Sequence, residues 1–294
     1  MRSWPAPQHH GDMPTSEAVL VTGASTGIGR AIVERLVTDA TRVFAAVRDL
    51  STVEAHPLVT PVRLDVTSAD EARAAADTVR DALGDTKLRG IVNNAGVAVG
   101  GPLEFVDLDE VRRQFEVNLV GQIAVTQAFL PLLRDHGPPD PRIVFTSSIG
   151  GRVASPFIGP YAASKHALNG IAESWRRELL PWGFRVSVLA PATVSTPIWD
   201  KAAGQVDDTV AALPPAGVEL YGDAIESMKK IVAGSNDAGI PPSQVADAAH
   251  HALFSRHPKA EYLVGREAKA MAAASTLIPY RAFDKVVLRV MRNS

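Results

Sequence analysis

Short apolar runs typical of β-strands alternate with longer helical patterns along most of this chain. The runs are AVLVTG (18–23), RVFAAV (42–47), VRLDV (62–66), GIVNNAG (90–96), RIVFTSS (142–148), RVSVLAP (185–191) and EYLVG (261–265). Between them, helices are predicted at about 29–37, 68–83, 107–133 and 159–180. This alternation builds βαβ units, and continuous apolar strands indicate a sheet covered by helices on both faces. We therefore expect an α/β fold with a doubly wound, mainly parallel sheet of seven strands.

The domain organisation follows from where the alternation stops. Residues 1–17 lack an apolar core and predict a flexible N-terminal lead. Residues 18–294 are expected to form a single domain, because no low-complexity linker divides them. Within it, the Pro- and Gly-rich stretch at about 194–240 predicts an insertion that caps the substrate end, and an amphipathic helix is predicted at about 280–292.

Composition excludes several classes of protein. The 30 basic and 32 acidic side chains give a net charge of −2, so no broad nucleic-acid surface is expected. The absence of cysteine rules out disulfides, thiolate catalysis and cysteine-ligated metal, and it fits a cytoplasmic location. No metal site is expected, because His9-His10 reads as a solvated pair in the N-terminal lead. No run approaches the ~20 apolar residues that a membrane span needs.

The segment TGASTGIG (22–29) joins the first predicted strand to the first predicted helix. Gly23, Gly27 and Gly29 allow a tight turn and close backbone approach, and the free N–H groups of the helix end favour a pyrophosphate. Ser25, Thr26 and Ile28 belong to the same turn. In an alternating fold this pattern predicts a nucleotide-binding Rossmann domain.

A tyrosine and a lysine stand four residues apart in YAASK (161–165), so a helix would place them on one face. Two interpretations are open. Tyr161 and Lys165 can be an ordinary solvated pair, or a proton donor beside the cation that tunes its pKa.

Together with NNAG (93–96) and the Gly-x3-Gly-x-Gly spacing, YAASK resembles the short-chain dehydrogenase/reductase family, with most similarity to its hydroxysteroid/retinol dehydrogenase-like branch. The resemblance extends from about Val19 to Gly265. It implies an NAD(P)-dependent alcohol dehydrogenase or carbonyl reductase acting on CH–OH groups. It also implies a homodimer or homotetramer paired through the helices at 107–133 and 159–180.

The resemblance assigns four catalytic residues. Tyr161 would exchange a proton with the substrate oxygen, while Lys165 lowers its pKa and reaches the nicotinamide ribose. Ser148, thirteen residues before Tyr161, would bind the substrate oxygen, with Ser147 as the competing choice because adjacent strand side chains face opposite ways. Asn118 would lie in a kinked helix whose carbonyl holds a water linked to the lysine, or would simply make a helix-packing hydrogen bond.

The end of the second predicted strand bears on the choice of cofactor. An acidic residue there favours NAD(H), whereas this chain has Arg48 followed by Asp49. In similar NADP-preferring members an arginine at this position meets the 2′-phosphate. We therefore expect NADP(H) as the favoured cofactor and NAD(H) as a possible one, with Arg48 as an ordinary surface cation as the alternative.

The resemblance extends the cofactor site to other segments. Asp65 and Val66 would contact the adenine, although Asp65 as a helix cap is an open alternative. The remaining expected cofactor residues are Asn93, Ala95, Gly96, Pro191, Val194 and Thr196, together with Tyr161 and Lys165.

The substrate end is apolar in sequence. The insertion carries Trp199, Leu213, Leu220, Tyr221 and Ile225, which either pack helices together or roof a pocket above Tyr161. The expected substrate-binding residues are Ser148, Phe157, Tyr161 and Trp199. These side chains favour a lipophilic alcohol or carbonyl, such as a steroid, a retinoid or an aliphatic or aromatic compound.

Two further alternatives are open. The basic, amphipathic C-terminal helix can contact an anionic membrane, although packing on its own protein is the expected arrangement. The same fold can also serve as a nucleotide-bound regulatory or scaffold protein. Such a protein has no need of the tyrosine and lysine, whereas this chain carries Asn118, Ser148, Tyr161 and Lys165 together.

Overall fold

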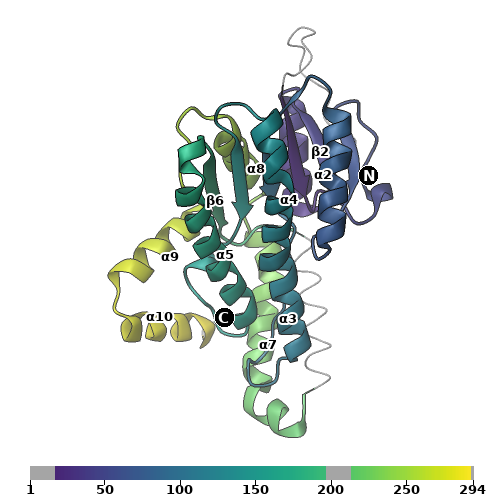
Figure 1. Ribbon diagram of the computed structural model, residues 1–294. Helices are drawn as coiled ribbons and strands as arrows, with labels where there is room; N and C mark the ends of the chain where they lie inside the picture. The colour runs from purple at the N-terminus through teal and green to yellow at the C-terminus, as the bar shows by residue number, and fades with distance from the viewer. Residues whose placement is uncertain (1–16, 197–212, 293–294) are drawn as a thin grey trace.

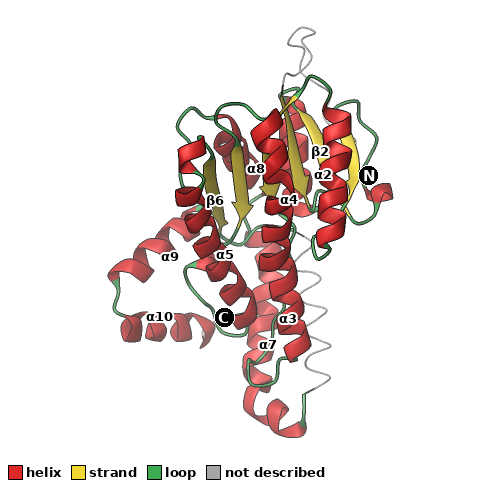
Figure 2. Cartoon of the chain, viewed as in Figure 1, coloured by secondary structure: helices red, strands yellow, loops and turns green. Residues whose placement is uncertain are grey.

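The computed structural model describes residues 17–196 and 213–292, except for the side chains of 227–238 and 290–292. Its described part contains one sheet of seven parallel strands in the order β3-β2-β1-β4-β5-β6-β7 (Figure 2). The strands are β1 (Glu17–Thr22), β2 (Arg42–Val47), β3 (Val59–Arg63), β4 (Lys87–Asn93), β5 (Arg142–Thr146), β6 (Arg185–Pro191) and β7 (Glu261–Val264). The strand order reverses between β1 and β4, which confirms the predicted doubly wound α/β fold and places a ligand crevice at that point.

Helices cover both faces of the sheet (Figure 1). One face carries α1 (Gly27–Thr38) and α8 (Pro242–Phe254), and the other carries α2 (Ala69–Leu83), α4 (Gly121–His136) and α5 (Gly159–Glu178). Side chains of β1 alternate between the two layers, with Leu20 in one core and Val21 in the other. This burial on both faces explains why the strands read as unbroken apolar runs.

The helix predicted at 107–133 is interrupted in the structure. It consists of α3 (Leu108–Phe115), a π-helical segment η2 (Glu116–Val120) and α4. The interruption coincides with a close approach, because a Cβ on Gly121 would lie 2.7 Å from the carbonyl oxygen of Val66. One wider turn lets the helix pass this backbone and continue.

The run Leu108–His136 is the one helix in the described residues that is long and apolar enough to cross a membrane. Half of its apolar window is buried inside the fold, as in the core helix of a globular domain. In Figure 1 the α4 part of this run lies against the sheet, and the α3 part extends beyond it.

The third strand begins and ends earlier than predicted. It was expected at 62–66, but β3 covers Val59–Arg63, in register with β2 from Val43↔Val59 to Val47↔Arg63. Asp65 therefore lies in the loop after the strand. The apolar pattern misplaced the boundary because β3 is an edge strand, which tolerates Pro61 in its middle.

The chain leaves the sheet after β6 and returns before α8. A bridge between Val194 and Ile240 joins the two ends of this excursion, and Ile240 N–H donates to the Thr193 carbonyl at 2.9 Å. The excursion contains α7 (Pro215–Ala238), which extends away from the sheet in Figure 1. Trp199 lies outside the described residues.

The C-terminal segment forms α9 (Arg266–Leu277) and α10 (Tyr280–Arg292), and α10 contacts α7 and α9. Short 3-10 turns connect other elements, namely η1 (Leu50–Thr52), η3 (Ile149–Gly151) and η4 (Leu180–Trp182).

Candidate active site

The glycine turn at 22–29 packs directly on the loop after β4. Gly23 has φ +63°, and a Cβ there would lie 2.9 Å from the Cα of Ala95. A Cβ on Gly29 would lie 2.1 Å from the Gly23 carbonyl oxygen, so neither position has room for a side chain. Thr26, the N-cap of α1, makes no side-chain capping bond, which leaves the N-terminal N–H groups directed at the crevice.

Asn94 holds this turn to β4. Its Nδ2 donates to the carbonyl oxygens of Thr22 at 3.0 Å and Gly23 at 3.3 Å. The Thr22 hydroxyl oxygen accepts from the backbone N–H groups of Asn94 and Ala95 at 2.9 and 3.0 Å. The carboxyl ends of β1 and β4 are thereby joined at the point where the strand order reverses.

A cleft of about 590 Å³ opens at these strand ends. Most of the residues expected at the cofactor site line it, namely Gly23, Ser25, Thr26, Gly27, Ile28, Arg48, Asp65, Val66, Ala95, Gly96, Tyr161, Lys165, Pro191, Val194 and Thr196. Ser148 also lines the cleft, as do Arg113 and Val117 of the α3–η2 region, which sequence reasoning missed. No local sequence pattern signals that these two residues line the cleft.

Asn93 corrects a prediction. It was expected beside the cofactor, but it is buried under the cleft, where its Nδ2 donates to the Thr126 hydroxyl at 2.9 Å. Asn94 of the same motif lines the cleft, but its side chain is bound to the carbonyl oxygens of the glycine turn. Successive side chains at the end of a strand face opposite ways, and that of Asn93 faces the core. Gly29 likewise lies beneath the turn and does not line the cleft.

Tyr161, in the first turn of α5, is 8% exposed and meets Ser148 at the end of β5. Burial raises the pKa of the Tyr161 phenol, and a hydrogen bond from the Ser148 hydroxyl, which favours the phenolate, partly opposes the rise. Ser147 points the other way, with its hydroxyl 3.5 Å from the Lys165 carbonyl oxygen. The structure thus brings Ser148, not Ser147, to the tyrosine.

Lys165, one helical turn after Tyr161, is 5% exposed. Its Nζ donates to the Thr146 carbonyl oxygen at 2.8 Å and lies 5.8 Å from the centre of the Tyr161 ring. Burial lowers the pKa of Lys165 to about 8. The sequence predicted that this lysine lowers the pKa of the tyrosine. In the protein alone burial dominates instead, because it disfavours the charged form of both groups.

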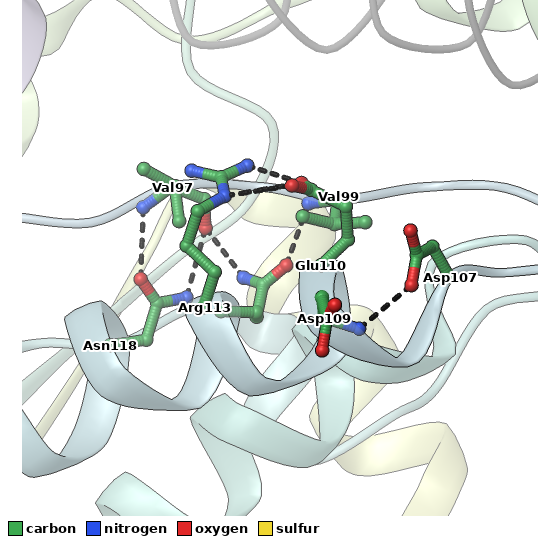
Figure 3. Close-up of polar contacts among 8 residues, drawn as sticks. Val97, Val99, Asp107, Asp109, Glu110, Arg113 and Asn118 are labelled. Carbon is green, nitrogen blue, oxygen red and sulfur yellow. Dashed lines mark hydrogen bonds and ion pairs between the residues drawn. The ribbon is translucent and has the colours of Figure 1, made fainter.

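Asn118 is fully buried in η2, and its side chain grips the loop that follows NNAG (Figure 3). Its Oδ1 accepts from the Val97 N–H at 2.9 Å, and its Nδ2 donates to the Val97 carbonyl oxygen at 2.9 Å and to the Ser164 hydroxyl at 3.1 Å. A Cβ on Gly96 would lie 3.3 Å from Asn118 Oδ1 and 3.7 Å from Lys165 Nζ. Asn118 therefore adjoins the lysine, in a helix whose regular hydrogen bonding is interrupted.

The end of β2 presents Arg48 to the cleft and turns Asp49 away from it. The Asp49 carboxylate accepts from the backbone N–H of Ser51 at 3.0 Å and from its hydroxyl at 2.7 Å, capping η1. These bonds hold the pKa of Asp49 below its usual value. The Asp49 carboxylate thus caps the local turn and does not line the cleft.

Asp65 makes a similar local turn, accepting from the Thr67 N–H at 3.0 Å and from the Thr67 hydroxyl at 2.8 Å. The N-cap of α2 is Ser68, whose hydroxyl accepts from Glu71 N–H at 3.2 Å. Asp65 is therefore not the helix cap, and it remains at the cleft.

Beyond Tyr161 the walls are apolar. Ala98 and Ile158 pack on the Tyr161 ring. Phe157 does not line the cleft itself, and its ring meets Tyr221 of α7 edge-on at 6.3 Å. Phe105, from the loop before α3, meets the same tyrosine at 5.9 Å. Sequence reasoning missed Phe105 and Ala98, because their loop has no periodic pattern.

The cleft fits a dinucleotide. Its glycine end leaves no room for side chains where a pyrophosphate would lie, and Ser148 and the buried Tyr161 and Lys165 stand at the other end. A nucleotide cradle that leads to a proton-transfer pair defines an NAD(P)-dependent oxidoreductase, which acts on CH–OH or carbonyl groups.

Comparison with known proteins identifies the family. The family model for short chain dehydrogenases matches residues 17–207, and the chain belongs to that family. An NADPH-dependent 3-dehydrocapnine reductase from Ornithobacterium rhinotracheale is 33% identical over 285 residues, covering 93% of this chain and 97% of the relative. Retinol dehydrogenase 5 from Mus musculus is 31% identical, covering 95% of this chain and 90% of the relative.

Solved structures agree with this assignment. A short chain dehydrogenase from Burkholderia cenocepacia J2315 in complex with NADP superposes with a TM-score of 0.72 at 26% identity, over 93% of this chain and 99% of the other. A short chain dehydrogenase/reductase from Burkholderia phymatum in complex with NAD gives 0.75 at 26% identity, over 88% and 92%.

Proposed function

We propose that this protein is an NADP(H)-dependent oxidoreductase that interconverts a lipophilic alcohol and its carbonyl compound. The observation that carries the proposal is the meeting of Ser148, Tyr161 and Lys165 at one end of a cleft whose other end is a glycine turn. Three elements, β5, α5 and the β1–α1 turn, supply these groups from distant parts of the sequence.

A bound nicotinamide supplies or accepts the hydride. In the direction of reduction, the Tyr161 phenol donates a proton to the substrate oxygen, and the Ser148 hydroxyl hydrogen-bonds that oxygen. Burial raises the pKa of Tyr161, which keeps the phenol protonated and able to donate at neutral pH. In the direction of oxidation Tyr161 takes the proton, and the positive charge on Lys165 favours the phenolate.

The preference for NADP(H) is supported by the end of β2. Arg48 faces the cleft, where its guanidinium can pair with a 2′-phosphate. The neighbouring acidic group, which would repel that phosphate, is Asp49, and its carboxylate is engaged by Ser51. The relative from Ornithobacterium rhinotracheale is named as NADPH-dependent, which also favours NADP(H) for this protein.

The lipophilic substrate is supported by the walls beyond the tyrosine. Ala98 and Ile158 cover the ring, and the aromatic cluster of Phe105, Phe157 and Tyr221 continues the apolar surface toward α7. Such walls bind an apolar skeleton through burial, with a few polar groups fixing its orientation. A relative named as a retinol dehydrogenase is consistent with this class.

We further infer a homo-oligomer paired through α4 and α5. The outer side of α5 carries small exposed residues, including Ala163 and Gly170, and a Cβ on Gly170 would meet nothing within 4 Å. A smooth helix face of this kind allows the same face of a second copy to approach closely.

The decisive experiment is turnover of NADPH with a panel of lipophilic carbonyl compounds, compared between the wild type and Tyr161→Phe. The expected result is activity in the wild type and a loss of about 100-fold or more in the variant, because the proton donor is removed. Unchanged activity in Tyr161→Phe would contradict the proposed chemistry. Cofactor binding without turnover of any compound would instead favour a regulatory or scaffold protein.

A further inference from the structure

Gln114 of α3 has a fully buried side chain, and both of its polar groups bind the backbone of one short segment. Its Oε1 accepts from the Val99 N–H at 2.6 Å, and its Nε2 donates to the Val97 carbonyl oxygen at 2.6 Å. A buried carboxamide is costly unless it is paired, and this one is paired at both ends. The Gln114 carboxamide therefore accepts one hydrogen bond from the backbone of residues 97–99 and donates one to it, as the backbone of a paired β-strand does.

Asn118, about one helical turn further on, grips the same segment. Val97 donates its N–H to Asn118 Oδ1, and its carbonyl oxygen accepts from both Asn118 and Gln114. Asn118 also donates to the Ser164 hydroxyl at 3.1 Å, and Ser164 donates to the Tyr161 carbonyl oxygen at 2.7 Å. A continuous chain of hydrogen bonds thus leads from Gln114 to the backbone of Tyr161.

The clamped segment is a wall of the reaction site. Val97 and Ala98 line the cleft, and Ala98 packs on the Tyr161 ring. If the segment moved, this wall would withdraw from the ring, and Asn118 would lose two of its partners. Proton transfer depends on the placement of the phenol to within a fraction of an ångström.

We propose that Gln114 is a positioning residue, whose carboxamide, together with that of Asn118, holds the segment 97–99 against Tyr161. This inference rests on the proposed function, because the geometry that Gln114 maintains is that of the proposed proton donor. The competing view is that Gln114 only stabilises the fold.

The test substitutes Gln114→Met, which keeps an unbranched side chain of similar length and removes both hydrogen bonds. The matched control is Gln244→Met, the same change at an exposed position of α8, away from the cleft and from the proposed pairing helices. Cofactor affinity, kcat, KM and amide hydrogen exchange are measured well below the unfolding midpoint of each variant.

The expected result for Gln114→Met is a fall of about 10- to 100-fold in kcat/KM with unchanged cofactor affinity. Exchange should also become faster at the Val97 amide. That amide is bonded to Asn118 and not to Gln114, so its exchange reports movement of the whole segment. The control should match the wild type in all measurements.

A second variant, Gln114→Glu, separates positioning from mere stability. A neutral carboxylic acid offers one donor and one acceptor, as the amide does, whereas the carboxylate only accepts. Its activity relative to wild type should therefore rise as pH is lowered. The charged and ionisable groups nearby, Glu110 and Arg113 on the same helix and Tyr161 and Lys165 on α5, are the same in both proteins, so the ratio is taken at each pH.

The proposal is overturned if Gln114→Met keeps the kcat/KM of the control and only its unfolding midpoint falls. If the wild type turns over no substrate, the proposed function fails and amide exchange alone decides this inference. Faster exchange at Val97 in the variant then supports the clamp, and unchanged exchange refutes it.

Discussion

At the residue scale, the ionisable side chains at one end of the cleft are buried, whereas the arginine at the other end is exposed. Lys165 and Tyr161 are buried, and burial disfavours the charged form of each. The pKa of Tyr161 is therefore raised and that of Lys165 is lowered. Arg48 is exposed and lines the cleft, where a phosphate can reach its guanidinium. The cleft thus has a dry end suited to proton transfer and a wet, cationic end suited to nucleotide recognition.

The exposed arginine leads to a prediction on cofactor choice. Arg48→Ala should weaken NADP(H) binding by about 10- to 100-fold, because charge-assisted hydrogen bonds to the 2′-phosphate are lost. NAD(H), which lacks that phosphate, should bind almost as before. Titration of both cofactors by fluorescence measures the difference.

The neighbouring carboxylate provides the control. Asp49→Asn should change the affinity for either cofactor little, because the Asp49 side chain is bound to Ser51 and turned from the cleft. An equal loss of both cofactors in Arg48→Ala would show that Arg48 does not read the 2′-phosphate.

Several residue assignments followed from the sequence because they depend on local spacing. Tyr161 and Lys165 share a helix face through their separation of four, and Ser148 was favoured over Ser147 by its distance from the tyrosine. Asn93 was misassigned, because its side chain faces the core and binds Thr126, which lies 33 residues away in the sequence. Gln114 was not found at all, because its partners are backbone groups about 15 residues away, which no side-chain pattern reveals.

At the element scale, the interruption of one long helix is the feature that shapes the site. The π-helical segment η2 lies between α3 and α4, and it carries Asn118, which binds Val97 and Ser164. Apolar periodicity could predict the length of this helix, since it reflects burial against the sheet. It could not predict the extra residue in one turn, which depends on how closely Gly121 passes the backbone of Val66.

The outer face of α5 leads to a prediction on assembly. Gly170→Arg should leave the fold of one copy intact, because nothing lies within 4 Å of the added Cβ, yet it should block a second copy from packing on that face. Sedimentation should show an oligomer for the wild type and a monomer for the variant. Ala74→Arg, on the exposed face of α2, is the control and should remain oligomeric.

Either of two sedimentation results would contradict this prediction. If the wild type sediments as a monomer, or if Gly170→Arg assembles as the wild type does, then α5 is not the pairing face.

At the scale of the whole molecule, the site is held by elements that the sheet brings together from distant parts of the chain. The crevice opens at the carboxyl ends of β1 and β4, where the strand order reverses, and the loop after β6 lines one side and is joined to Ile240 by the bridge from Val194. Tyr161 and Lys165 are buried only when these parts assemble. Their burial therefore links the chemistry of the site to the stability of the fold.

Burial of Lys165 has a measurable consequence for stability. Its pKa is about 8 in the folded protein against 10.5 in the unfolded chain, so between these values the unfolded chain binds more protons. Folding should then become more favourable as pH rises, by up to about 1.4 kcal/mol per pH unit. Below pH 8 the cost of burying the charge is fully present.

The measurement compares the free energy of unfolding of the wild type and Lys165→Met. From about pH 8 to about pH 9.5, below the range in which most tyrosines ionise, the wild type should gain stability relative to the variant. If the free energies of unfolding of the two proteins changed equally with pH, Lys165 would have the same pKa in the folded protein as in the unfolded chain.

The sequence by itself determined the fold class, the nucleotide turn and the types of the reacting residues, because periodic burial and fixed local spacing leave a direct trace in the chain. The tertiary structure decided which serine meets the tyrosine, where Asp49 points, how deeply Lys165 is buried and what Gln114 holds. These depend on contacts between residues far apart in sequence, whose side-chain directions and desolvation exist only once the sheet and its helices have assembled.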